Sequence, residues 1–81
     1  MLLSKQRTIE VLRRERLGLT EFAYEMRVGA GEALRMATGL QPLDYGAAKR
    51  FMDLVGFNNF AYAAESEEVR IHAKRIAAEY S

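Results

Sequence analysis

The residues that could do chemistry in this chain are few, and their types favour binding over catalysis. His72 is the only histidine, the chain has no cysteine, and no second metal ligand stands at a characteristic spacing from His72. Serine and aspartate occur, but no motif joins them to His72, and the G-A-G at 29–31 is too short for a phosphate loop and lacks its lysine. We therefore predict no catalytic site, no metal and no cofactor, and expect His72 on a helix surface or at an interface.

The basic and amide side chains are the groups that suit phosphates and base edges. The net charge is only +1, and residues 1–16 hold five basic and two acidic residues, whereas the rest of the chain is slightly acidic. A strongly basic nucleic-acid binder would differ from this, so contact with a polyanion depends on a local patch. The run RRER at 13–16 has two interpretations: phosphate contact, or a solvated helix face in which Glu10 pairs with Arg13 or Arg14.

Length and composition indicate one small globular domain over residues 1–81. Hydrophobic residues make up 49% of the chain and charged residues 28%. The absence of cysteine fits a reducing compartment, the apolar runs are too short to span a membrane, and the N-terminal residues lack the apolar core of a signal peptide. We expect a soluble, cytoplasmic protein that makes no membrane contact.

The elements that must position these side chains are short helices, because alternating strand patterns are missing and helix-favouring residues are frequent. The expected helices cover about 4–16, 19–27, 30–38, 45–55, 60–64 and 67–80. Their expected N-caps are Ser4, Asp44, Asn58 or Asn59, and Ser66, and Gly18, Gly39 and Gly56 are expected to interrupt or end helices. The predicted fold class is all-α, a compact bundle of five or six short helices.

Apolar residues at helical spacing predict the buried faces. In the first helix Ile9 and Leu12 lie three residues apart on one face, and Val11 lies off that face. In the second helix Tyr24 and Glu25 are expected to point away from the core. The expected buried residues of the later helices are Phe22, Ala23, Met26, Ala33, Met36, Ala37, Ala47, Ala48, Phe51, Leu54 and Val55.

The stretch FAYEMRVGAGEALRMATG at 22–39 resembles the helix-turn-helix of the phage repressor and Cro family, the Xre-like or lambda-repressor-like domains. The positions where that motif keeps apolar residues are occupied here by Phe22, Ala23, Met26, Val28, Ala33 and Met36. Ala23 stands where a small residue lets the two helices cross closely, and Gly39 stands where a glycine ends the recognition helix. The resemblance covers about residues 5–60 and implies a helix-turn-helix inside the bundle.

The resemblance also implies which residues face DNA. The implied groove-facing positions are Gly29, Ala30, Gly31, Glu32, Leu34 and Arg35. Arg35 is the obvious partner for a guanine or a phosphate, whereas the other positions are small, apolar or acidic. The implied contacts with the DNA backbone come from Gln41, Lys49 and Arg50, with Arg27 as a further candidate. Arg27 stands where the motif usually has glycine, so a turn of the usual shape would place Arg27 at positive φ.

The last expected helix, within residues 66–81, has apolar residues spaced by threes and fours. These residues are Val69, His72, Ala73, Ile76 and Tyr80. They either cover the core of their own domain or form a dimer contact, and Phe57, Phe60 and Tyr62 could belong to the same surface. Repressors of the resembled type dimerise so that two recognition helices meet successive major-groove faces about 34 Å apart. A homodimer is therefore the expected assembly.

Two functional hypotheses follow from these patterns. The first is a small phage-like transcriptional regulator of the repressor type that binds double-stranded operator DNA as a homodimer. The second is a protein-interaction module on the same scaffold, acting as an antirepressor, modulator or antitoxin that binds a regulator, polymerase or toxin. The small, slightly acidic and apolar surface of residues 29–34 motivates this second hypothesis.

Overall fold

Five helices form the domain in the computed structural model, which describes residues 1–64. They are α1 (Lys5–Arg14), α2 (Leu19–Met26), α3 (Ala30–Ala37), α4 (Tyr45–Val55) and α5 (Phe57–Ala63). Within these residues the only β-type pairing is a single bridge between Leu3 and Ala64, so the predicted all-α class is confirmed. No helix in residues 1–64 is long and apolar enough to cross a membrane. The expected helix at 66–81 and its dimer residues Val69, His72, Ala73, Ile76 and Tyr80 lie outside the described residues.

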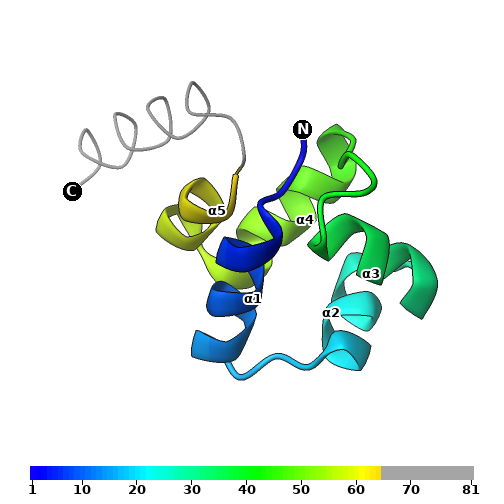
Figure 1. Ribbon diagram of the computed structural model, residues 1–81, viewed down its shortest axis with the longest axis horizontal. Coiled ribbons are helices and arrows are strands. Elements are labelled where there is room, and N and C mark those ends of the chain that lie inside the picture. The colour runs from blue at the N-terminus through cyan, green and yellow to red at the C-terminus, as the bar shows by residue number, and fades with distance from the viewer. Residues whose placement is uncertain (65–81) are drawn as a thin grey trace.

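The helices pack around one apolar core. Helices α1 and α4 both contact α5, and α2 contacts both α3 and α4, so α2 and α3 form one end of the bundle (Figure 1). Phe51 of α4 lies at the centre. Its ring meets that of Phe22 edge to face at 5.8 Å between centroids and lies 6.1 Å from that of Phe60.

Helix α1 begins where the sequence predicts but buries a different face. The Ser4 hydroxyl accepts a hydrogen bond from the Arg7 amide at 3.4 Å, which confirms Ser4 as the N-cap. The expectation that Val11 lies off the buried face is wrong, because Thr8, Val11 and Leu12 are buried and Ile9 is only half-buried. These three follow the i, i+3, i+4 spacing of a helix face. The apolar residues alone do not indicate this face, because one of its three buried residues, Thr8, is polar.

Replacing Thr8 with valine is expected to raise the free energy of unfolding by about 1 kcal/mol. Thr8 is fully buried, and its Oγ1 atom has no hydrogen-bond partner among the described residues. Valine has nearly the same shape and removes the desolvated hydroxyl. Urea unfolding measures the change, and the exposed Thr20→Val variant is the control, with an expected change within about 0.5 kcal/mol. A less stable Thr8→Val variant would show that the hydroxyl has a partner.

Asp44 sets the beginning of α4, and Gly56 separates the end of α4 from the beginning of α5. The Ala47 amide donates to Asp44 Oδ1 at 2.8 Å, which confirms Asp44 as the N-cap of α4. Gly56, at φ 88°, ends α4 as expected and also precedes the first residue of α5. The expected cap at Asn58 or Asn59 is wrong, because α5 already begins at Phe57 and both asparagines lie within it. The Asn59 amide instead links α5 to α1, donating to Glu15 and accepting from Arg14.

The aromatic residues of α5 mostly face the domain itself. Phe60 packs on the core, and the Tyr62 hydroxyl donates to the Glu10 carboxylate of α1. This hydrogen bond, with smaller effects of desolvation and of the negative charge of Glu10, raises the pKa of Tyr62. The Tyr62 ring lies under the guanidinium groups of Arg7 and Arg14, at 5.4 and 5.7 Å from its centroid. Glu10 therefore has a tyrosine partner from another helix.

The N-terminal segment, residues 1–4, runs across the bundle and joins distant parts of the chain. Leu3 is fully buried. The Leu43 amide donates to the Met1 carbonyl oxygen at 2.7 Å, and the Ser4 amide donates to the Ala63 carbonyl oxygen at 2.7 Å. The segment therefore connects the loop after α3 to the end of α5.

Candidate nucleic-acid interface

Helices α2 and α3 are joined by a tight turn centred on Arg27. Arg27 has φ 59° and ψ 42°, so the expectation of a positive φ at this position is confirmed. The Val28 amide donates to the Ala23 carbonyl oxygen at 3.1 Å, the closing bond of a Schellman motif. This geometry ends α2 at Met26 and lets α3 begin at Ala30.

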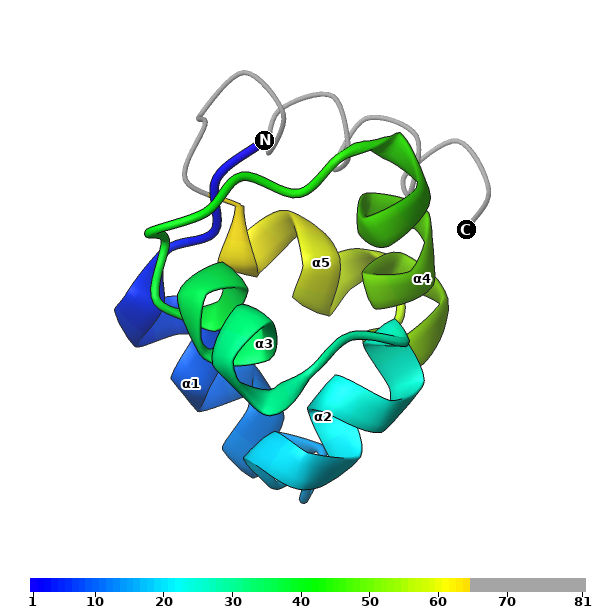
Figure 2. The same ribbon diagram turned by 90° about the vertical axis from the view of Figure 1, so that its right-hand side faces the viewer.

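The back of α3 is fixed to the bundle by small and apolar side chains. Ala33, Met36 and Ala37 are buried, as expected, and so is Ala23 on the facing helix. Alanines at the contact let the two helices approach closely. The opposite face of α3 is open to solvent (Figure 2) and carries Gly29, Ala30, Gly31, Leu34 and Arg35.

The end of α3 turns back on itself at Gly39. Gly39 has φ 77°, which confirms it as the stop of the recognition-helix candidate. Both following amides, of Leu40 and Gln41, donate to the Arg35 carbonyl oxygen, at 2.9 and 3.2 Å. A Cβ atom at position 39 would lie 2.6 Å from the Leu3 carbonyl oxygen, so the N-terminal segment also requires glycine there. The turn returns the Gln41 side chain to the exposed face of α3.

Three predicted site residues form one hydrogen-bonded chain on that face. Gln41 Nε2 donates to Glu32 Oε1 at 3.0 Å, and Arg35 Nε donates to Gln41 Oε1 at 3.1 Å. The Glu32 carboxylate accepts only the NH2 side of the Gln41 amide, which leaves the amide oxygen for Arg35. We call this chain the Glu32–Gln41–Arg35 relay. It fixes the Arg35 side chain through Nε and leaves its two terminal amino groups for another partner.

Glu32 and Gln41 thereby have different surroundings from those that the sequence alone implies. Both side chains are half-buried and are bonded to each other. Glu32 thus supports Gln41 and is less available for contact with a base edge. Their spacing in the sequence, on either side of the turn at Gly39, indicates a contact between Glu32 and Gln41 only once the shape of that turn is known.

The two basic residues of α4 lie in different surroundings. Lys49 is exposed, beside a shallow apolar cavity lined also by Tyr45, Ala48, Met52 and Phe60. Arg50 is half-buried, and its Nε donates to the Met26 carbonyl oxygen at 3.1 Å, which satisfies one of the last carbonyl groups of α2. Arg50 therefore stabilises the end of α2 besides being a candidate for contact with phosphate.

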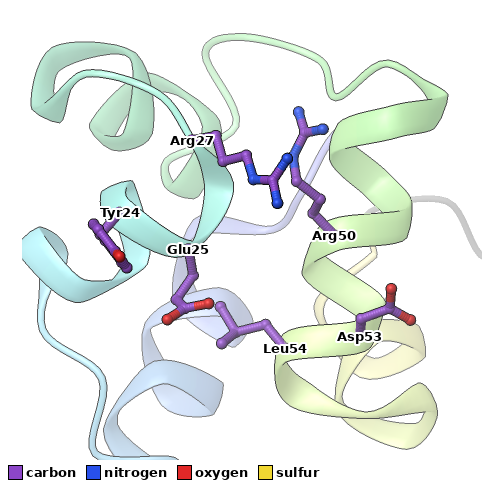
Figure 3. A pocket seen from close by; sticks show the side chains of 6 residues that line it. All are labelled: Tyr24, Glu25, Arg27, Arg50, Asp53 and Leu54. Carbon is purple, nitrogen blue, oxygen red and sulfur yellow. The ribbon is translucent and has the colours of Figure 1, made fainter.

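A cleft of about 770 Å³ opens between α2 and α4, and the sequence alone does not indicate it. It is lined by Tyr24, Glu25, Arg27, Arg50, Asp53 and Leu54. Figure 3 shows the Arg27 and Arg50 side chains extending toward one another at one end, with the Glu25 and Asp53 carboxylates apart from them. The lining residues of α4 follow the i, i+3, i+4 spacing of a helix face, a signal that becomes useful once α2 and α4 are known to pack together.

Two leucines expose apolar surface near the relay. Leu34 is 51% exposed on α3 and Leu40 is 78% exposed in the turn that follows it.

Among residues 1–64 no group of three or more potential metal-ligating side chains comes together. Comparison with known proteins finds no matching family model, no matching curated protein and no matching solved structure.

Proposed function

We propose that the protein is a small transcriptional regulator that binds double-stranded DNA and inserts α3 into the major groove. The observation that carries the proposal is the Glu32–Gln41–Arg35 relay on the open face of α3. An arginine held through Nε presents its terminal amino groups as a fork, the geometry that suits O6 and N7 of guanine. Preorganisation of that fork reduces the side-chain entropy lost on binding.

The assembly in this proposal is a homodimer. Its sequence basis is the pattern at Val69, His72, Ala73, Ile76 and Tyr80, and its physical basis is that one short helix reads only a few base pairs. Two copies related by a two-fold axis would read two half-sites about one helical turn apart. Such a regulator would work in the cytoplasm.

The experiment that tests this function begins with selection of duplexes from a random pool by the purified full chain. Anisotropy titration then compares the selected duplex with a scrambled duplex at roughly 50 and 200 mM salt. We expect tighter binding to the selected duplex and a steep loss of affinity at the higher salt, because phosphate contacts release counterions. A folded protein that enriches no duplex and binds none at the lower salt would contradict the proposal.

A second candidate function, docking on another protein, is favoured by the exposed Leu34 and Leu40. Exposed apolar side chains around glycine and alanine suit a protein surface better than a polyanion. In this case α3 would be the centre of a protein interface on a regulator, polymerase or toxin.

The Leu34→Arg variant separates the two functions. If α3 lies in the groove, we expect non-specific duplex affinity to rise by up to about tenfold at low salt, because another cation faces the phosphates. Leu2→Arg, at a leucine that is also partly exposed but lies on the N-terminal segment, is the matched control. Anisotropy with a scrambled duplex measures both variants. Unchanged duplex binding, together with loss of a protein that the wild-type chain captures, would favour the second function.

A further inference from the structure

The two arginines that share one end of the α2–α4 cleft form an unusual pair. Their side chains come from the α2–α3 turn and from the middle of α4 and extend toward one another (Figure 3). Arg50 is held at the end of α2 by the bond from its Nε to the Met26 carbonyl oxygen, which leaves its terminal amino groups for another partner. Two like charges that converge on one cavity repel each other, and an anion between them would remove that repulsion.

The backbone at Arg27 adds a second, independent observation. Arg27 adopts the left-handed conformation at φ 59°, which glycine adopts without strain and which most other residues disfavour. The Schellman turn fixes this conformation but does not require an arginine, because glycine would adopt it at lower cost. The arginine at position 27 thus costs stability both through its backbone and through its charge beside Arg50.

We propose that Arg27 and Arg50 together bind one phosphate group of the DNA backbone, and so anchor the turn that leads into α3. Guanidinium groups bind phosphate oxygens with paired, charge-assisted hydrogen bonds, and the two positive charges here exceed the single negative charge of a backbone phosphate. Helix α3 begins three residues after Arg27, so the partial positive charge of its N-terminus lies near the same anchor. The inference rests on the proposed function, although a free phosphate ion shares the same chemistry.

The Arg27→Gly variant tests the phosphate site formed by Arg27 and Arg50, because the stability of the variant and its affinity for the duplex should change in opposite directions. We expect the melting temperature to rise by about 4 °C as strain is relieved. We expect affinity for the selected duplex to fall by about tenfold, and the slope of log K against log salt to decrease by about one. Arg27→Lys keeps the charge and should retain most of that slope.

Arg16→Gly is the matched control, because Arg16 is also an arginine at positive φ, 58°, but is exposed at the end of α1 outside the cleft. It should gain stability like Arg27→Gly. Lys5→Ala, which removes an exposed cation outside the cleft, is the control for the salt slope and should keep the wild-type value. A duplex-binding protein in which Arg27→Gly leaves the slope unchanged, or in which Arg27→Gly and Lys5→Ala lower it equally, would overturn the proposal.

Titration with inorganic phosphate separates this inference from the proposed function. The readout is the NMR signals of the arginine side-chain Nε–H groups in the wild-type chain. If the chain binds no duplex, the proposed function fails. Phosphate-induced shifts confined to the Arg27 and Arg50 signals would then still support these two residues as a binding site for a free phosphate ion. Absence of such shifts in a chain that binds no duplex would overturn the site as well.

Discussion

Replacement of Gly39 by alanine is expected to destabilise the domain by roughly 3 kcal/mol, a large part of the stability of a domain this small. At φ 77° an alanine costs about 1–2 kcal/mol of backbone strain. Its Cβ atom would also lie 2.6 Å from the Leu3 carbonyl oxygen, and relief of that overlap adds about 1–3 kcal/mol because backbone must move. Urea unfolding measures the loss as a lower midpoint at an unchanged slope.

Gly29→Ala is the control for this prediction. Gly29 has φ −71°, and no atom lies within 4 Å of the position of an added Cβ. The expected change is below about 1 kcal/mol, since only the N-cap preference of the residue changes. Equal stability of the two variants would contradict both the positive φ of Gly39 and the passage of the N-terminal segment over it. Such a result would also remove the reason why Gln41 returns to the exposed face of α3.

Replacement of Arg35 by alanine is expected to lower affinity for the selected duplex by about 10- to 100-fold, the discrimination that one bidentate base contact provides. The loss should be concentrated at one base pair: duplexes that differ at that guanine should bind the variant equally. Arg35→Lys keeps the charge but loses the fork, so it should recover non-specific affinity without recovering the base preference. Competition titrations with single-base variants of the duplex measure both effects.

Gln41→Ala and Lys5→Ala complete that series. Gln41→Ala leaves the Arg35 fork without its support, so we expect an intermediate loss of affinity. Lys5→Ala removes one exposed positive charge from α1 that takes no part in the relay, and it should leave the base preference intact. An Arg35→Ala variant that weakens binding to all duplexes equally would assign Arg35 to phosphate rather than to a base.

The helix ends are predictable from the sequence because each depends on a local rule. Asp44 is a carboxylate placed to accept from the amide three residues later, and Gly39 and Gly56 follow apolar helical runs. The left-handed backbone at Arg27 is implied by the resemblance instead, because the resembled motif usually has glycine at this position of its turn.

The contacts that build the candidate site depend on distant parts of the chain, and the sequence does not specify them. Arg50 appears in the sequence as a free cation, and only the packing of α4 on α2 brings it to the Met26 carbonyl oxygen. The Glu32–Gln41–Arg35 relay depends on the turn at Gly39, and that turn depends in part on Leu3. The buried face of α1 is ambiguous because Thr8, a polar residue, completes it.

During translation, residues 1–4 are synthesised long before their partners. The hydrogen bonds of this segment go to Leu43 and Ala63, and at ordinary rates of synthesis the last of these partners follows about 3–12 s later. Helices α1 to α3 can form locally in that interval, but Leu3 has no α5 to join. The native contacts of Leu3 are therefore complete only once the chain up to Ala63 is available, and until then the apolar residues that it covers lack this partner.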